Sequence, residues 1–400
     1  MVAPTHSAKP GLRALPPPPD FRDLRDREFP FVARAPYLNA ASVTPLPERS
    51  RRALDAFNLR RSDVHALRGD DFEPTLARAR RAAARLVNGG EDEIALLPNT
   101  SFGINLAAHC LPVERGRRVL LSHGEFPANV YPWMALEETR GLRAELLPRA
   151  ADGTPDEARM LEEVERGDVG IVAVSAVQFA DGWVADLAAL GRACARQGCW
   201  LVVDGIQALG QLPLDPRALG VHLLATGGHK WLCSPFGTGF AWVARELVER
   251  MEPRVVGWTS MAAAADLEWV TAYEPGWVEG ARRFEVATQP FHDYAAFAES
   301  LALLREADPV RIRQHLLALL TPLEGWLRER GVAVAGGTAP ERRSGILAFR
   351  PADPAAAHRA LAEAGVGCVL REGAVRLSPH LYNQPDDMER VMDVLKGSLP

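Results

Sequence analysis

From about residue 30 to residue 280, short apolar runs alternate with longer stretches in which apolar residues recur with helical period. Helices are predicted over stretches such as Glu73–Val87 and Asp186–Gln197. Six runs have the length and composition of buried strands: Ile94–Leu97, Val119–Ser122, Gly170–Ser175, Trp200–Asp204, His222–Thr226 and Gly239–Val243. Continuous apolar runs separated by helices indicate strands buried on both faces of a mainly parallel sheet, hence an α/β fold.

After about residue 280 the pattern changes to long helices followed by a few strands. Helices are predicted over Phe291–Ala307, Arg311–Arg330, His358–Ala364 and Asp386–Leu395, and strands over Ser344–Phe349 and Gly373–Leu377. We therefore expect three parts: a Pro-rich arm at 1–30, a large domain at 31–280 and a smaller α+β domain at 281–400.

Composition and charge narrow the class of protein. Hydrophobic residues make up 47% of the chain and the net charge is only −5, so neither a nucleic-acid partner nor a basic protein partner is indicated. No stretch resembles a signal peptide or a membrane span, so we expect a cytoplasmic protein without membrane contact. The five cysteines are scattered without zinc-ligand spacing, so we expect no metal site.

Lysine is rare in this chain, and its placement is informative. Only three of the 46 basic residues are lysines, and Lys9 and Lys396 lie in predicted tails. Lys230 is the one lysine in the body of the chain, inside an apolar, Gly-rich stretch. An arginine cannot form an imine, whereas a desolvated lysine amine is a nucleophile. The alternative is a surface lysine without a role.

Asp204 and Lys230 both follow predicted strands, and the carboxyl ends of parallel strands are where such sheets bind ligands. A buried carboxylate needs a partner, and a protonated pyridine nitrogen is one. Asp204 alone is equally compatible with a helix N-cap. Together with Lys230, it predicts a pyridoxal 5′-phosphate site in which Lys230 holds the cofactor as a Schiff base.

The motifs Asp204-Gly-Ile-Gln207 and Gly228-His229-Lys230 in series resemble those of the class V aminotransferases, PLP enzymes of fold type I. That family includes cysteine desulfurases, selenocysteine lyases, kynureninases and isopenicillin-N-epimerase-like proteins. The resemblance extends from Tyr37 to Asn383. It implies a large PLP-binding domain with a mainly parallel sheet and a smaller C-terminal domain.

The resemblance also implies roles for residues around the cofactor. Thr100 and Ser101, at a predicted helix start, would bind the phosphate together with His229. Gln207 would reach the ring oxygen. Phe126 would stack on the pyridine, although it is also compatible with a place in the core.

Two further matches concern the substrate and a second subunit. Arg376 matches the arginine that binds the substrate α-carboxylate, with an ordinary salt bridge as the alternative. Thr288 matches a threonine that reaches the phosphate of a neighbouring subunit. We therefore expect a homodimer with a shared active site and an amino acid as its small-molecule substrate.

The reaction type is less constrained than the cofactor. The site residues predict proton removal from the substrate Cα by Lys230 but do not select the step that follows. The resemblance favours elimination or desulfuration of a cysteine-like or other β-substituted amino acid. An epimerase, an aminotransferase and an inactive binding protein on the same fold stay open. Desulfurases need a mobile cysteine loop, and here the nearest candidate, Cys368, has an apolar, strand-like setting that favours a structural role. Cys233 lies closer to Lys230, but the resemblance gives it no role.

Overall fold

The computed structural model describes residues 19–397, except 266, 267, 269, 270 and 272. A seven-stranded sheet has the order β1-β7-β6-β5-β4-β2-β3, and a four-stranded sheet has the order β10-β11-β9-β8. The strands of the large sheet are β1 (Ile94–Leu96), β2 (Arg118–Ser122), β3 (Arg143–Leu147), β4 (Val169–Ser175), β5 (Trp200–Asp204), β6 (Leu223–Gly227) and β7 (Gly239–Val243). Those of the small sheet are β8 (Ala333–Ala335), β9 (Leu347–Arg350), β10 (Val369–Arg371) and β11 (Ala374–Leu377).

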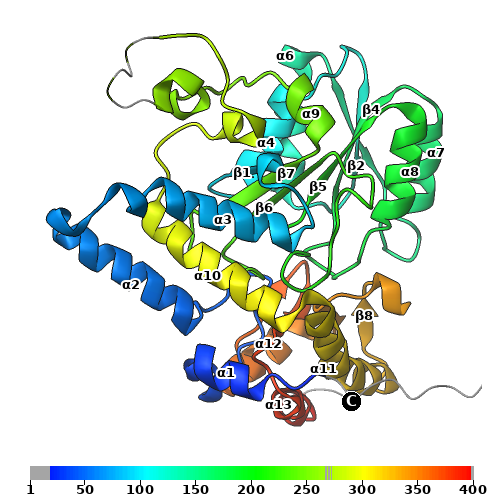
Figure 1. Ribbon diagram of the computed structural model, residues 1–400. Coiled ribbons are helices and arrows are strands. Elements are labelled where there is room, and N and C mark those ends of the chain that lie inside the picture. The colour runs from blue at the N-terminus through cyan, green and yellow to red at the C-terminus, as the bar shows by residue number, and fades with distance from the viewer. Residues whose placement is uncertain (1–18, 266–267, 269–270, 272, 398–400) are drawn as a thin grey trace, which may run out of the picture.

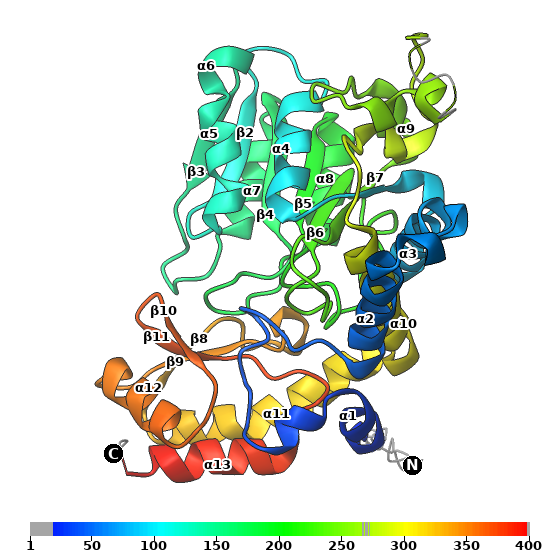
Figure 2. The same cartoon turned by 90° about the vertical axis from the view of Figure 1, so that its left-hand side faces the viewer.

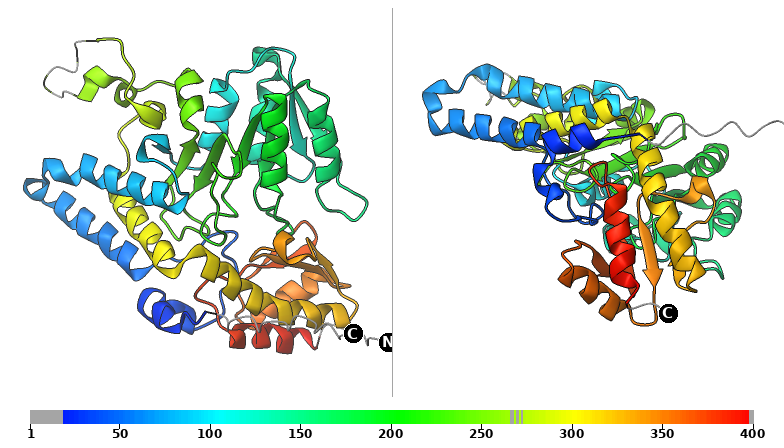
Figure 3. Two further views of the ribbon diagram at one scale, coloured as in Figure 1. Left: turned by 45° about the vertical axis from the view of Figure 1, so that its right-hand side comes forward. Right: turned by 90° about the horizontal axis from the view of Figure 1, so that it is seen from below.

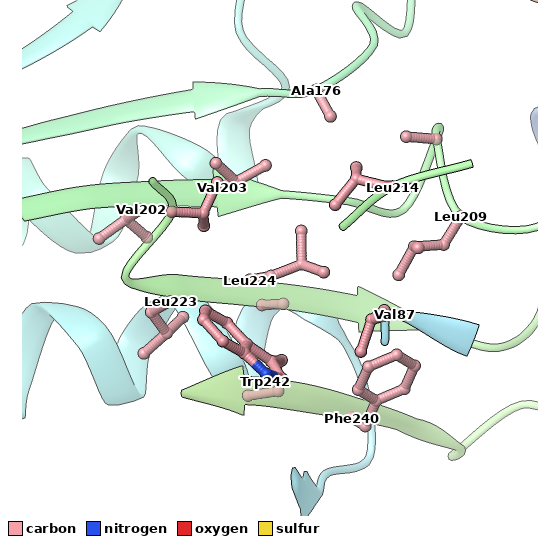
Figure 4. Packing of buried hydrophobic residues seen from close by; sticks show 14 of the residues in the cluster. Val87, Ala176, Val202, Val203, Leu209, Leu214, Leu223, Leu224, Phe240 and Trp242 are labelled. Atoms are coloured by element: carbon pink, nitrogen blue, oxygen red, sulfur yellow. The ribbon is translucent and has the colours of Figure 1, made fainter. Parts of the chain in front are cut away.

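The large sheet is mainly parallel, as the sequence predicts. Strands β3, β2, β4, β5 and β6 pair in parallel, and β7 joins both β6 and β1 in antiparallel orientation. Every residue of β4 to β7 is buried, because helices cover both faces. Helices α4 and α5 lie on one face, and α7 and α8 lie on the other (Figures 1 and 2). Figure 4 shows Val202 and Val203 of β5 and Leu224 of β6 among the packed hydrophobic side chains of this core.

Thirteen α-helices are present in the described residues. The first seven are α1 (Arg22–Glu28), α2 (Glu48–Ser62), α3 (Glu73–Leu86), α4 (Thr100–Cys110), α5 (Tyr131–Ala135), α6 (Glu137–Arg140) and α7 (Glu157–Glu165). The others are α8 (Leu187–Gln197), α9 (Arg245–Arg250), α10 (Phe291–Ala307), α11 (Pro309–Glu329), α12 (Pro354–Glu363) and α13 (Pro385–Leu395). None of them is long and apolar enough to cross a membrane.

The small sheet lies next to the carboxyl edge of the large one, with α11 and α13 on its far side (Figure 2). Phe349 and Val375 point to that far side and join a second apolar core with these helices. Strands β10 and β11 are joined by the two-residue turn Glu372-Gly373, in which both residues have positive φ (49° and 71°). A two-residue turn of this kind matches the twist of the paired strands, so β10 and β11 are joined without a longer loop.

Two segments pack differently from what the predicted domain boundaries suggest. Helix α10 falls in the range expected for the smaller domain, yet it packs against α2 and α3 beside the large sheet (Figure 3). The arm predicted for 1–30 contains α1 in its described part, and Phe21 and Leu24 are buried against the main core. Residues 1–18 of that arm lie outside the described residues. The division into domains stays a prediction.

Candidate active site

Asp204 and Lys230 come together at the carboxyl edge of the large sheet. Asp204 is the last residue of β5 and pairs with Ala225 of the neighbouring strand β6. Lys230 follows the end of β6 by three residues. Thr44 holds this turn in place, since its backbone N–H donates to the carbonyl of His229 and its hydroxyl donates to the carbonyl of Lys230. Both side chains therefore lie at the carboxyl ends of neighbouring strands, as the sequence predicts.

The two side chains shift each other's ionisation. Burial raises the pKa of Asp204 to about 6, and the charge of Lys230 opposes that shift. Burial lowers the pKa of Lys230 to about 8; Asp204 acts against this, whereas Arg376 and Arg371 lower it further. An amine with a lowered pKa is a better nucleophile and base at neutral pH.

Asp204 does not cap a helix. Its Oδ1 accepts a hydrogen bond from the backbone N–H of Ile206 at 2.9 Å, and the described residues 205–222 form turns without a helix. The side chain is 2% exposed. A buried carboxylate of raised pKa is costly to ionise unless a cation such as a protonated pyridine joins it. Asp204 therefore fits the ring nitrogen of PLP.

Phe126 lies beside the lysine and not in the core. The Nζ of Lys230 is 5.4 Å from the centroid of its ring, and the ring is 39% exposed. Phe179 meets it edge-on, with 5.3 Å between the ring centroids. A ring held at this place has a free face for a flat cofactor.

The residue before Phe126 is a second buried carboxylate. Glu125 accepts hydrogen bonds from the backbone N–H of Ser175 at 2.9 Å, from Gln178 Nε2 at 2.6 Å and from Asn129 Nδ2 at 3.1 Å. Burial raises its pKa, and its charge contributes to the raised pKa of Asp204. This network fixes the start of the segment that carries Phe126. The sequence contained Glu125 within the matching motif, but its role was not predicted.

The residues expected at the phosphate also gather. Thr100 and Ser101 begin α4, and the side chain of Asn99 caps that helix by accepting from Phe102 N–H at 2.9 Å. Thr100 Oγ1 is buried and has no hydrogen-bond partner among the described residues. A Cβ built on Gly227 would lie 3.5 Å from Thr100 Oγ1 and 3.5 Å from His229 Nδ1, so all three residues are neighbours.

This arrangement fits an anion. The first turn of α4 presents free backbone N–H groups, and an unpartnered buried hydroxyl is a donor in need of an acceptor. Burial and the charge of Lys230 lower the pKa of His229 to about 4, so its imidazole is neutral and has one N–H to donate. The residues at this end of the site therefore suit a phosphate group.

Two predicted contacts remain untested. The amide of Gln207 donates to the carbonyl of Ala41 at 3.0 Å and accepts from Trp231 Nε1 at 2.7 Å, so both ends already have protein partners. Thr288 is exposed in the loop between the 3-10 helix Gly280–Phe284 and α10. Their roles at the ring oxygen and at a neighbouring phosphate stay predictions.

Arg376 lies on β11, faces the site and is not part of a salt bridge with any described carboxylate. Its Nη1 donates to the carbonyl of Phe179 at 2.6 Å and its Nη2 donates to Ser42 Oγ at 2.9 Å. The Nε atom is buried without a partner. Burial and the charge of Arg371 lower the pKa of Arg376 to about 10. A positioned guanidinium without a counter-ion fits a substrate carboxylate.

Comparisons with known proteins agree with this geometry. The sequence profile described as aminotransferase class-V matches residues 37–391. The chain is 29% identical over 412 residues to a probable cysteine desulfurase of Aeropyrum pernix, covering 93% of this chain and 96% of the relative. It is 26% identical over 385 residues to the uncharacterized aminotransferase YcbU of Bacillus subtilis, covering 94% and 96%.

Solved structures share the fold. A cysteine desulfurase from Thermococcus onnurineus superposes with a TM-score of 0.83 at 21% identity, covering 94% of this chain and 98% of that one. The cystine C–S lyase C-DES, in complex with cysteine persulfide, superposes with a TM-score of 0.82 at 24% identity, covering 92% and 99%. At these identities the likeness establishes the fold predicted from the sequence.

Proposed function

Since the chain belongs to the class V aminotransferase family, which depends on pyridoxal 5′-phosphate, we propose that it is a C–S lyase acting on S-substituted cysteines. The reaction joins the substrate and one water to give a thiol, pyruvate and ammonium. The observation that carries this choice is the tight hairpin of β10 and β11. Its two-residue turn Glu372-Gly373 follows the nearest candidate, Cys368, and provides no mobile cysteine loop of the kind that a desulfurase needs.

Lys230 would hold the cofactor covalently, with Asp204 at the ring nitrogen and Phe126 on one ring face. Thr100, Ser101 and His229 would bind the phosphate, and Gln207 would lie near the ring oxygen. When bound, the cofactor supplies an electron sink for negative charge at the substrate Cα.

The side chains of this protein then have distinct tasks. Arg376 binds the α-carboxylate through two parallel hydrogen bonds, and the Phe179 carbonyl and Ser42 hydroxyl keep its guanidinium in place. The amine of Lys230 removes the Cα proton, for which a pKa of about 8 is well suited. Departure of the sulfur from Cβ follows without any protein nucleophile.

Neither cysteine near the site is suited to attack the substrate sulfur. Burial raises the pKa of Cys368 to about 11 and that of Cys233 to about 12, so both are protonated at neutral pH. Cys368 directly precedes β10, which is paired with β11 along its length. Cys233 is fully buried and lies 3.7 Å from His380 Nε2, behind the lysine turn. Elimination is therefore favoured over transfer of sulfur to the enzyme.

The relatives support a reaction on sulfur amino acids. Several curated relatives are named probable cysteine desulfurases, and one solved neighbour is named a cystine C–S lyase. We also propose a homodimer, in which the partner subunit would cover exposed apolar side chains such as Phe236, Val255, Val256 and Trp258. Thr288 would then contribute to the partner's site.

The test uses PLP-loaded protein with L-cysteine, L-cystine and a panel of S-alkyl-L-cysteines, with pyruvate and alanine quantified by mass spectrometry. We expect pyruvate and the matching thiol from the S-substituted substrates. Alanine from L-cysteine would instead establish desulfuration. Loss of a Cα deuterium label without product would establish epimerisation, and a requirement for a 2-oxo acid would establish transamination.

A further inference from the structure

One face of the small sheet carries three arginines among small residues. The strand register places Ala333, Arg350 and Ala374 in a row across β8, β9 and β11, and Arg371 of β10 pairs with Ala374 at its end. The next row contains Ala335, Ala348, Arg376 and Val369. Paired residues of neighbouring strands project to the same side, so Arg350, Arg371 and Arg376 share one face.

This face looks toward the active site and not toward the helices. Arg376 contacts Phe179 and Ser42, and Ala333, Ala335 and Arg350 line an interdomain cavity. The register makes Arg371 a diagonal neighbour of Arg376 on this face, and the charges of both arginines lower the pKa of Lys230. Arg371 is thus a second arginine close to the reacting centre, for which the family resemblance gave no role.

Among the described residues, no carboxylate pairs with any of these three arginines. Arg376 is buried, Arg371 is half-buried and Arg350 is exposed. The contrast is Arg118 in the large sheet, which is buried like Arg376 but binds Asp168, Glu145 and Glu163. Arg371 Nε is buried without any hydrogen-bond partner. Arg350 donates from its Nη2 to the carbonyl of Glu372 at 3.3 Å. A buried N–H group without a hydrogen-bond partner is costly, so the Nε groups of Arg371 and Arg376 favour binding of an acceptor from a ligand.

The cavity beside this face has a volume of about 830 Å³. Its other wall consists of Pro127, Phe179 and neighbouring residues of the large domain, and Phe179 is the residue whose ring meets Phe126. Glu372 of the tight turn also lines the cavity. The cavity therefore lies beside the arginine-bearing face and reaches Phe179, whose carbonyl accepts from Arg376 and whose ring meets Phe126.

We propose that Arg371 binds a second anionic group of the substrate, carried by the part of the molecule beyond the sulfur. The proposal rests on the proposed C–S lyase function and narrows its substrates to S-substituted cysteines with a carboxylate or similar anion on the leaving thiol. Diagonal neighbours such as Arg371 and Arg376 are roughly 7–8 Å apart at their Cα atoms. A carboxylate two carbons beyond the sulfur lies at about that distance from the α-carboxylate, so one substrate can reach both arginines.

Binding is tested first with two probes that cannot undergo elimination. L-2-aminopimelate has a methylene in place of the sulfur and a distal carboxylate, and its ω-amide is the neutral counterpart. Calorimetry with the PLP-loaded protein should give a Kd for the carboxylate that is about 10- to 100-fold lower, as expected for hydrogen bonds to a charged group. Equal Kd values in the wild type would overturn the proposal.

Variants assign the effect to one residue. R371Q should remove the preference for the carboxylate while leaving the Kd of the amide unchanged, and R371K should retain part of the preference. R359Q is the matched control, because Arg359 is exposed on α12, which packs on the opposite face of the sheet. A preference that survives in R371Q, or that R350Q removes in its place, contradicts the assignment to Arg371.

Turnover separates this proposal from the proposed function. S-(2-carboxyethyl)-L-cysteine and S-(2-carbamoylethyl)-L-cysteine are compared by pyruvate release, and we expect the same preference in kcat/KM. If the carboxylate probe binds more tightly but neither cysteine derivative yields pyruvate, the lyase function fails while the second anion site stands. If both derivatives react equally and the two probes bind equally, the lyase function stands and the second anion site fails.

Discussion

Two walls enclose the site, and they handle charge in opposite ways. The first wall, at the carboxyl edge of the seven-stranded sheet, is called the large-sheet wall. It places the Lys230 amine near the Asp204 carboxylate, so each charge partly offsets the other. The second, formed by the four-stranded sheet and called the small-sheet wall, carries Arg376 and Arg371, whose guanidinium groups have no carboxylate partner among the described residues. A wall with balanced charges suits a cofactor that brings a cationic ring nitrogen to Asp204. A wall with unbalanced positive charge requires anions from the substrate.

Removing the Lys230 amine from the large-sheet wall should have the largest effect on activity. We expect Lys230→Ala to lower pyruvate release by about 1,000-fold or more, because both the covalent attachment of the cofactor and proton removal depend on this amine. Visible absorbance of the lysine-bound cofactor should also disappear. Lys396→Ala is the control, since Lys396 pairs with the exposed Asp393 at the end of α13. Normal absorbance in Lys230→Ala would contradict the assignment.

Asp204→Asn tests the partner of that amine. We expect about 100- to 1,000-fold lower turnover, since the carboxylate keeps the ring nitrogen protonated. Without cofactor the same variant should be more stable than the wild type. The pKa of Asp204 is raised from 3.8 to about 6, so its ionised form costs about 3 kcal/mol at pH 7.

The pH dependence gives this stability gain a distinct signature. A raised carboxyl pKa contributes stability at low pH that is lost as the pH rises from about 4 through 6. Thermal unfolding of the apo-protein should therefore show a larger gain for Asp204→Asn at pH 7 than at pH 5. Asp55→Asn, on the exposed face of α2, should leave both values unchanged. A gain of the same size at both pH values would contradict the burial argument.

The large-sheet wall was predictable from sequence because each of its two charged residues is marked by the strand pattern before it. Asp204 and Lys230 each follow an apolar run, and the carboxyl ends of neighbouring parallel strands must meet at one edge. All six strands predicted before residue 280 are present. Strand β3 was missed, because Arg143–Leu147 lies at the edge of the sheet and four of its five residues are not fully buried. An edge strand has no continuous apolar run to reveal it.

The small-sheet wall was only partly predictable from the sequence. The family motif identified Arg376, but Ser42 and Phe179, which hold it, lie 334 and 197 residues away in the chain. Strands β8 and β10 are three residues long and are too short to show a periodic pattern. Without them the register of the sheet is unknown, and the shared face of Arg350, Arg371 and Arg376 is invisible. The unpaired state of these arginines is a property of the packed structure alone.

Arg376→Lys changes the small-sheet wall only in part. A lysine keeps the charge but loses the planar fork that forms two parallel hydrogen bonds with a carboxylate. We expect KM to rise about 10- to 100-fold, with a smaller change in kcat. Steady-state kinetics with one S-alkyl-L-cysteine measures both values. Arg390→Lys, on the exposed side of α13, is the matched control. An unchanged KM would contradict the role of Arg376 at the α-carboxylate.

The smallest effect is the influence of each wall on the same amine. Only neutral Lys230 can attach to the cofactor, so the rate of attachment to apo-protein should rise with pH through about 8, the pKa of that amine. Arg371 lowers this pKa and Asp204 raises it. R371Q should therefore move the midpoint to higher pH, whereas Asp204→Asn should move it to lower pH. Stopped-flow absorbance after mixing with saturating cofactor measures the midpoint, with R359Q as the control. Shifts of the same sign in both variants would show that the walls do not act on Lys230 in opposite directions, because a direct electrostatic effect must change sign with the charge removed.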